Sequence, residues 1–253
     1  MKNDSQIKTL IENEVKILHS CKSENIIKCY ATYFDSGAIN ILLEFMNLGT
    51  LADILKKVKK IPENILGNIT YQILTGLEYM HFDKRIVHRD IKPSNILINS
   101  RGSVKISDFG VSSIVIDSMK GKETLVGTYN YMSPERIKVN NYSFNSDVWS
   151  VAMTLLESAV GVYPFFYSGE NNDDTINKNI NDFWSLHKVI DELNVPELPK
   201  DEFSEEFRDF IKSCLEKDPS KRPNSKILLE HPFVIKYSHK DNFNDLVKWL
   251  KRI

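Results

Sequence analysis

The chain has 253 residues, of which 42% are hydrophobic, 10% aromatic and 26% charged. These proportions are typical of a globular protein and argue against a disordered, collagenous or coiled-coil chain. Its 33 basic and 34 acidic residues give a formal net charge of −1. We therefore expect no nucleic-acid partner and no polybasic attachment to a membrane. The most apolar stretch, residues 148–166, contains Glu157 and Pro164, so we also expect no transmembrane span.

The cysteines and histidines indicate neither a disulfide framework nor a metal site. Cys21, Cys29 and Cys214 are widely separated and form no CxxC pair, and the six histidines form no HExxH-like group. This pattern favours a reducing compartment, so we expect the protein in the cytoplasm, with the nucleus left open as a second location. We expect Cys29 and Cys214 to be core residues, because free cysteines are usually buried.

The N-terminal part of the chain is predicted to form one helix followed by strands. Residues 4–19 show helical spacing, and two strand-like runs, Ile26–Phe34 and Ile39–Phe45, are joined by a hairpin turn at 35–38. Two further short strands are expected at 96–98 and 104–106.

The rest of the chain is mainly helical. Helices are expected at about 50–58, 62–81, 145–161, 183–193, 204–216 and 224–230. Residues 110–144 have the composition of a long functional loop, and residues 170–182 that of a surface insertion. The tail 243–253 places Leu246, Trp249 and Leu250 on one face, either as a docking helix or as a helix packed against the larger lobe. The order of elements predicts an α+β fold.

One segment carries the chemistry of phosphoryl transfer. HRDIKPSN occupies residues 88–95, and Asp-Phe-Gly follows at 108–110, on a loop between a long helix and two short strands. Phosphoryl transfer needs positioning and charge neutralisation from the protein. Asp90 is the candidate acceptor of the proton of the attacking hydroxyl, and Lys92 can offset charge on the transferred group. Asn95 and Asp108 offer the oxygen ligands that Mg²⁺ prefers.

These motifs, together with Ser133-Pro134-Glu135, resemble those of the eukaryotic protein kinases. The resemblance covers residues 5–237. It implies that Asp147 braces the catalytic loop, which contains Arg89, that Arg222 pairs with Glu135, and that Glu14 is the helix-C glutamate. The implied cofactors are ATP and Mg²⁺. The implied nucleotide contacts are Leu43, Glu44, Met46, Thr50, Asp53, Lys92, Asn95, Leu97 and Asp108, with hinge backbone groups from Glu44 and Met46 and a floor beneath adenine from Leu97.

Within the kinases, VGTYNYMSPERI at 126–137 is most similar to the MAP kinase kinases. Ste20-type kinases are the nearest alternative, but they usually carry GTPxWMAPE at this point. The resemblance aligns Ser118 and Thr124 with the two activating phosphorylation sites, in the spacing of the plant and protist enzymes. A phosphate there can pair with Arg89 and order the loop, although polar loop hydroxyls without this role remain the alternative.

Two parts of a working kinase are missing from the sequence. No two of the ten glycines are separated by a single residue, so GxGxxG is absent, and no VAxK-like strand precedes Glu14. We therefore expect a fragment or a truncated gene model: a nearly complete helical C-lobe, with an N-lobe reduced to helix C and a β-hairpin. The expected parts are an N-lobe remnant at 1–45, hinge and C-lobe at 46–237, and a tail at 238–253.

The function expected from the resemblance is ATP-dependent phosphorylation of Ser, Thr and Tyr hydroxyls in a protein. The implied substrate is a MAP kinase activation loop, and the implied activator is an upstream kinase. The alternative is a catalytically impaired kinase-like module that binds or docks such partners without turnover. The intact residues Asp90, Asn95 and Asp108 favour the first reading, whereas the missing glycine loop and lysine favour the second.

Overall fold

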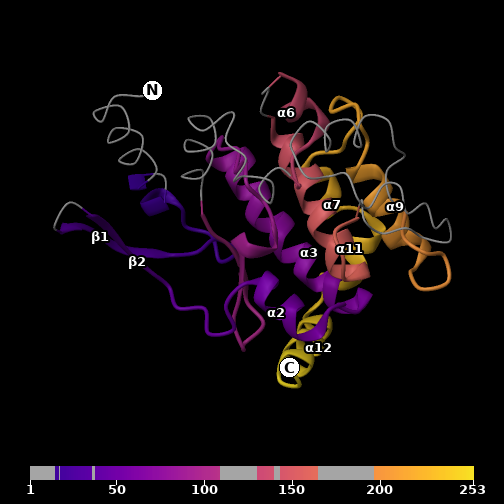
Figure 1. The fold of residues 1–253 in the computed structure, drawn as a ribbon, viewed down its shortest axis with the longest axis horizontal. Coiled ribbons are helices and arrows are strands. Elements are labelled where there is room, and N and C mark those ends of the chain that lie inside the picture. The colour runs from indigo at the N-terminus through magenta and orange to yellow at the C-terminus, as the bar shows by residue number, and fades with distance from the viewer. Residues whose placement is uncertain (1–14, 17, 36–37, 109–129, 140–142, 165–196) are drawn as a thin grey trace.

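The computed structural model describes residues 15–16, 18–35, 38–108, 130–139, 143–164 and 197–253. Most of the helix expected at 4–19, the surface insertion at 170–182 and the helix expected at 183–193 lie outside the described residues. The described elements form two small two-stranded sheets and a larger group of helices (Figure 1). This arrangement confirms the α+β class. None of the helices in the described ranges is long and apolar enough to cross a membrane.

The first sheet is a hairpin that extends away from the helices (Figure 1). Strand β1 (Cys29–Asp35) pairs antiparallel with β2 (Ala38–Leu43), and the register shifts between Cys29 and Ala31. The hairpin begins later than the predicted Ile26, because residues 26 and 27 pair elsewhere. Ile26 bridges Ile106, and the backbone N–H of Ile27 donates to the carbonyl of Ile106 at 2.9 Å. Both isoleucines are buried, which explains why they pair with Ile106 and do not extend the hairpin.

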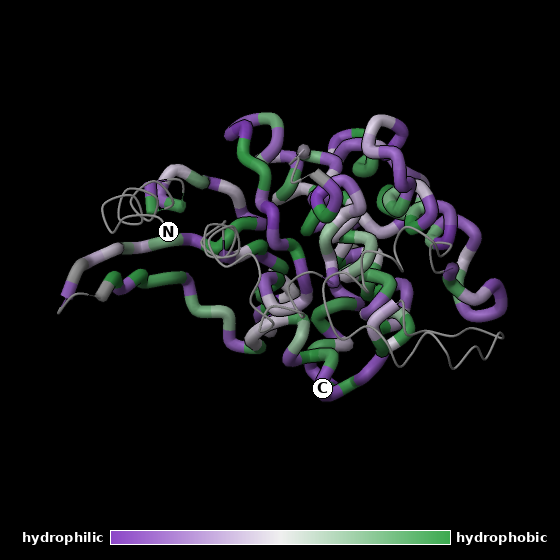
Figure 2. The backbone as a smooth tube through the Cα atoms, turned by 45° about the horizontal axis from the view of Figure 1, so that its top comes forward, coloured by the Kyte–Doolittle hydropathy of each residue, from purple (hydrophilic) through white to green (hydrophobic). Residues whose placement is uncertain are grey.

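The hairpin keeps much apolar surface exposed. The exposed large side chains in and beside it are Tyr30, Tyr33, Ile41, Leu42 and Phe45. Apolar residues run along β2 where it leaves the helical body (Figure 2). Cys29 is only half-buried, so the prediction that it is a core residue was wrong, whereas Cys214 is fully buried as predicted. The difference follows from the position of Cys29 at the start of an uncovered strand.

The second sheet pairs the two short strands that the sequence predicts. Strand β3 (Ile96–Ile98) is antiparallel to β4 (Val104–Ile106). All the residues of β4 are buried, and so are both ends of β3. The sheet is therefore a rigid support for the segments at its ends, which are the catalytic loop before β3 and Asp108 after β4.

The helices form one hydrophobic core around α3. The described helices are α2 (Leu51–Val58), α3 (Glu63–Glu78), α6 (Pro134–Val139), α7 (Phe144–Val160), α9 (Glu205–Cys214), α10 (Ser225–Leu229), α11 (Pro232–Tyr237) and α12 (Lys240–Leu250). Helix α3 contacts α7, α10, α11, α12 and β4, and α3 and α7 lie side by side in Figure 1. Helix α11 approaches α3 closely, because a Cβ added at Gly67 would lie 2.0 Å from the ring of Tyr237.

Three helical features differ from the sequence prediction. Helix α6 lies inside the region expected to be a loop, and α11 was not predicted. Pro232 begins α11 and the His231 side chain accepts a hydrogen bond from the first turn, which stabilises a helix too short to show clear periodicity. Helix α3 does not run regularly to residue 81, because residues 79–83 form a π-helical turn.

The C-terminal tail packs against the body of the protein. Leu246 and Leu250 of α12 are buried, and Trp249 is partly buried against the core. The backbone also comes close to α12 at Gly102, where an added Cβ would lie 2.9 Å from Val247. Of the two predicted alternatives for the tail, packing against the larger lobe is therefore the one observed.

Candidate active site

The catalytic loop is anchored by a buried carboxylate on α7. Asp147 accepts hydrogen bonds from the backbone N–H groups of His88 and Arg89, both at 2.8 Å. The Nε2 atom of His81 lies 2.8 Å from Asp147 Oδ2, and the other ring nitrogen lies 3.3 Å from the hydroxyl of Ser225. Burial alone would raise the pKa of Asp147, but these hydrogen bonds and nearby histidines outweigh it and lower that pKa. Asp147 therefore holds the loop as an ionised group.

The anchor allows an uncommon backbone conformation in the loop. Arg89 has a φ of 75°, in the left-handed region that non-glycine residues rarely adopt. Its N–H is held by Asp147, and its carbonyl accepts a hydrogen bond from the guanidinium of Arg136 on α6. Such backbone strain persists where surrounding contacts stabilise it. Here hydrogen bonds fix both the N–H and the carbonyl group of Arg89.

His88 connects the catalytic loop to the end of β4. Its Nε2 lies 2.9 Å from the carbonyl oxygen of Ser107, and its Nδ1 accepts the backbone N–H of Asp90 at 3.2 Å. These partners place the proton on Nε2, since a carbonyl can only accept. Burial lowers the pKa of His88, against the opposing effect of nearby carboxylates. A neutral imidazole therefore fixes the backbone at the candidate catalytic aspartate.

Asp90, Lys92 and Asn95 form one hydrogen-bonded group. Lys92 Nζ lies 2.8 Å from Asp90 Oδ2, and the Asn95 amide donates to the same oxygen at 2.9 Å and to the Asp90 carbonyl at 2.7 Å. The Asp90 side chain is 5% exposed and that of Lys92 is 18% exposed. The carboxylate is thus oriented by two donors, and one of them is the ammonium group of Lys92.

Asp108 follows β4 and is close to the catalytic loop through Ser107. The Ser107 N–H donates to the carbonyl of Asn95 at 2.9 Å, and its hydroxyl donates to the same carbonyl at 3.2 Å. Asp108 has a φ of 59° and an exposed side chain. Ser107 therefore holds together the two segments that carry the candidate metal ligands, Asn95 and Asp108.

The oxygen donors fit a magnesium ion bound together with a nucleotide. The described residues contain no group of three or more His, Cys, Asp or Glu side chains able to hold a metal alone. Mg²⁺ is commonly held by one or two carboxylates together with waters and substrate phosphates. One amide oxygen on Asn95 and one exposed carboxylate on Asp108 match that ligand set.

The segment predicted to contact adenine is fixed by an ion pair that the sequence did not predict. Glu44 lies 3.0 Å from Lys105 Nζ of β4, and both side chains are largely buried. The N–H of Glu44 donates to the carbonyl of Lys28 at 2.8 Å. Met46 is buried, whereas Leu43 and Leu97 are partly buried against the core. The roles of these residues in nucleotide binding stay predictions.

Thr50 and Asp53, also predicted nucleotide contacts, form the N-terminal cap of α2. The Thr50 hydroxyl accepts the backbone N–H of Asp53 at 3.1 Å, and the Asp53 carboxylate accepts the backbone N–H of Thr50, also at 3.1 Å. This capping box contributes to a low pKa of Asp53, about 2, mainly through the hydrogen bonds from Thr50. Nucleotide binding by this pair stays a prediction, and the described contacts serve the helix.

Glu135 of α6 and Arg222 form a bidentate ion pair. The guanidinium donates to the two carboxylate oxygens at 2.9 and 3.2 Å, and also to the carbonyls of Asn145 and Glu216, each at 2.8 Å. The Arg222 side chain is fully buried and lies over the ring of Trp149 at 5.2 Å. Burial alone would raise the pKa of Glu135, but Arg222 lowers it. The pair joins α6 to the segment before α10.

Several predicted residues lie outside the described part of the chain. They are Glu14, the two aligned phosphorylation sites Ser118 and Thr124, and Phe109 and Gly110 of the metal-binding motif. Their predicted roles therefore stay predictions. By contrast, no motif or spacing indicates a role for His81 or Lys105, whose partners Asp147 and Glu44 are 66 and 61 positions away along the chain.

Comparison with known proteins identifies the family. A Protein kinase domain family model matches residues 1–234. Mitogen-activated protein kinase kinase 2 of Arabidopsis thaliana is 45% identical over 236 residues, which are 93% of this chain and 63% of that protein. The kinase kinase SIPKK of Nicotiana tabacum is 43% identical, covering 95% of this chain and 66% of the relative. For the dual specificity kinase kinase dSOR1 of Drosophila melanogaster, the identity is 42% and the coverage 91% and 61%.

The chain spans a little under two thirds of the length of these three curated relatives. These likenesses confirm the resemblance to MAP kinase kinases. They agree with the geometry, in which an anchored loop presents Asp90, Lys92 and Asn95 close to Asp108. The chain belongs to the protein kinase family and is similar to its MAP kinase kinases.

Proposed function

We propose that the protein transfers the γ-phosphate of ATP to serine, threonine and tyrosine hydroxyls of a MAP kinase, after activation by an upstream kinase. The observation that carries the proposal is the shared contact of Lys92 and Asn95 with one oxygen of Asp90, at 2.8 and 2.9 Å. The names of the relatives support the substrate class, since they are mitogen-activated protein kinase kinases, one of them described as having dual specificity.

Each residue of the site has a role that its contacts support. Asp90 orients the acceptor hydroxyl and takes its proton, because two donors fix the orientation of its carboxylate. Lys92 stays beside Asp90 and offsets negative charge on the transferred group. Asn95 and Asp108 would hold Mg²⁺ on the nucleotide phosphates, and the ion would neutralise the charge that develops there.

The function is tested by comparing the wild type with Asp90→Asn. The full chain is incubated with Mg-ATP and a MAP kinase whose own catalytic aspartate has been replaced, and phosphate incorporation is measured. The amide cannot accept the proton, so we expect kcat to fall by about 10²- to 10⁴-fold. Ser118→Ala/Thr124→Ala should prevent activation by an upstream kinase without changing nucleotide binding. Equal incorporation by wild type and Asp90→Asn would refute the proposal.

A second candidate is a module that binds a partner kinase without turnover. The specific observation in its favour is that the 253-residue sequence contains no Gly-x-Gly pair, whereas kinases place a glycine-rich loop over the phosphates. Thermal unfolding with and without Mg-ATP separates the two candidates. If Mg-ATP binds, a Mg-ATP concentration of 100 times its Kd would raise the free energy of unfolding by about 2.7 kcal/mol. Binding of a MAP kinase without any nucleotide-dependent shift would favour the second candidate.

A further inference from the structure

A thiol, an imidazole and a hydroxyl converge at the base of the first hairpin. Cys29 begins β1, and its Sγ lies 3.6 Å from Nε2 of His19. The Thr32 hydroxyl oxygen lies 3.0 Å from the same nitrogen and 3.7 Å from the sulfur. The imidazole comes from the helical residues 18–20, and the other two groups come from β1. These side chains form a group of their own, separate from the residues assigned to phosphoryl transfer.

The group is open to solvent. His19 is exposed, and Cys29 and Thr32 are half-buried. In the described part of the chain, β1 pairs with β2 alone, so no further strand covers the sulfur. A small dissolved molecule can therefore reach Cys29 without any opening of the core.

The hydrogen-bond partners of Cys29 show how its thiol can lose the proton. The S–H group has two acceptors within reach, the Ala31 carbonyl at 3.6 Å and His19 Nε2. A carbonyl only accepts a hydrogen bond, whereas a neutral imidazole can take the proton itself. After that transfer, the N–H of His19 and the hydroxyl of Thr32 are two donors for the thiolate. A thiolate beside a protonated imidazole is the arrangement that makes a cysteine nucleophilic.

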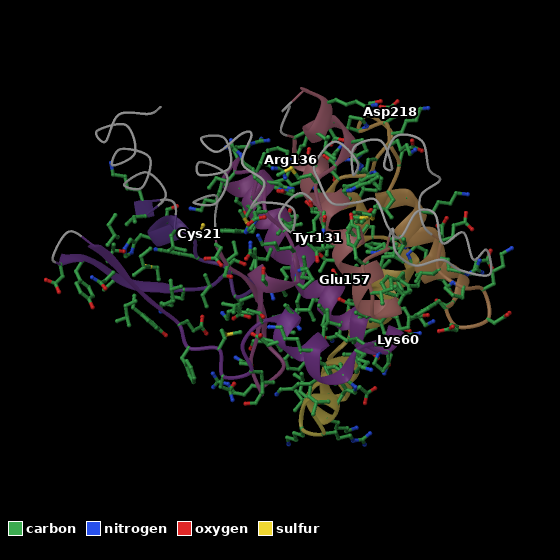
Figure 3. All side chains as sticks on the ribbon, viewed as in Figure 1. Cys21, Lys60, Tyr131, Arg136, Glu157 and Asp218 are labelled. Carbon is green, nitrogen blue, oxygen red and sulfur yellow. The ribbon has the colours of Figure 1, made fainter. Side chains whose placement is uncertain are left out.

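The other two cysteines of the chain lack this arrangement. Cys21, labelled in Figure 3, lies on the segment that joins the helical residues to the hairpin, and burial raises the pKa of its thiol. Cys214 is fully buried, and burial raises the pKa of its thiol as well. Among the described residues, neither sulfur has a histidine as a hydrogen-bond partner. Both are therefore internal controls for the reactivity of Cys29.

We propose that Cys29 is a site of reversible oxidation by hydroperoxides, with His19 as the base and then the acid of the reaction. The thiol proton moves to His19 Nε2, and the thiolate attacks one oxygen of hydrogen peroxide. The S–O bond forms as the O–O bond breaks, so the sulfur is oxidised to a sulfenic acid and the peroxide is reduced. The departing hydroxide takes the proton from His19 and leaves as water, and the imidazole is neutral again.

A small thiol reverses the modification. It condenses with the sulfenic acid of Cys29 to form a mixed disulfide and water. A second thiol molecule then attacks that disulfide, which releases the Cys29 thiol and the oxidised small thiol. The proposed site is independent of the kinase function, since neither step involves a nucleotide or a protein substrate.

The test measures the oxidation rate of each cysteine in the full chain. The protein is exposed to hydrogen peroxide at pH 7, the sulfenic acid is trapped with dimedone, and the labelled peptides are quantified by mass spectrometry. A free thiol is only a few per cent thiolate at pH 7, so complete proton transfer raises the rate by at most about thirtyfold. We expect Cys29 to react at least about tenfold faster than Cys21. His19→Gln should remove most of this advantage, because the amide cannot take the thiol proton.

The matched control is His239→Gln, because His239 is exposed and its side chain makes no capping bond to α12. This variant should keep the wild-type rate at Cys29. A second measurement uses the wild type unfolded in urea, in which Cys29 is fully exposed but has lost His19. The folded protein should react at Cys29 at least about fivefold faster than the unfolded chain. A Cys29 rate no higher than that of Cys21, no higher than in urea, or unchanged in His19→Gln would each overturn the proposal.

Discussion

Replacing Asp147 by asparagine measures how strongly the catalytic loop depends on one buried carboxylate. The substitution keeps the size of the side chain but removes its charge and turns one acceptor into a donor. Three donors point at this carboxylate: the backbone N–H groups of His88 and Arg89, and the ring of His81, each at 2.8 Å. Whichever way the amide is oriented, at least one of them faces another donor.

The expected cost follows from these three contacts. One buried donor left unsatisfied costs about 1–3 kcal/mol, and the others lose about 1 kcal/mol each when the acceptor is no longer charged. Asp147→Asn should therefore lower the free energy of unfolding by about 3–5 kcal/mol, out of roughly 5–15 kcal/mol for a typical domain. For a domain of this size that corresponds to a fall in Tm of about 6–20 °C.

The assay is urea unfolding followed by circular dichroism, with thermal unfolding as a second measure. Asp201→Asn is the control, because Asp201 is exposed and such substitutions usually change stability by less than about 0.5 kcal/mol. A loss in Asp147→Asn no larger than that of the control would refute the inference that this carboxylate holds the loop. Unchanged stability with lost phosphorylation would also refute it, since it would assign Asp147 a role in the chemistry alone.

Three further predictions concern other parts of the structure. Arg222→Lys should lower the free energy of unfolding by about 2–4 kcal/mol, because lysine cannot replace the bidentate bond to Glu135; a loss below about 1 kcal/mol in urea unfolding would contradict this. Gly67→Ala should destabilise by about 1–3 kcal/mol, although alanine normally favours helices, because its Cβ would meet the Tyr237 ring; a raised Tm would contradict it. The lowered pKa values of Asp147 and Glu135 contribute stability above the unfolded values, about 3.9 and 4.3, and the contribution is lost as pH falls towards the folded values. When unfolding is measured from pH 7 to pH 3, the free energy of unfolding should therefore fall less steeply with pH in Asp147→Asn than in the wild type.

The sequence predicts the local parts of the fold well. Helix α3, before the catalytic motif, and strands β3 and β4, after it, occupy nearly the predicted residues. They are predictable because burial of one face leaves a periodic pattern in the sequence. The predicted start of the first strand at Ile26 was wrong, since apolar residues look alike whether they pair within the hairpin or with Ile106. Helix α11 was missed because six residues are too few to establish a period.

The candidate site shows the same division between local and distant contacts. HRDIKPSN places Asp90, Lys92 and Asn95 within six consecutive residues, so their contact is close to a consequence of spacing. The contacts of Asp147 with His81 and of Glu44 with Lys105 join residues far apart in the chain. No period or motif encodes such pairs, and they require the packed structure.

The π-helical turn at residues 79–83 determines the direction in which the side chains after α3 point, just before the chain enters the active site. A π turn accommodates one more residue than an α turn, and each residue of an α-helix rotates the chain by about 100°. His81 lies within this turn and faces Asp147. Deleting one residue there to regularise the helix would turn His81 away from α7, or advance the whole loop that follows. The extra residue of the π-helical turn thus lets α3 keep its regular repeat while the catalytic loop begins at the position that its contacts require.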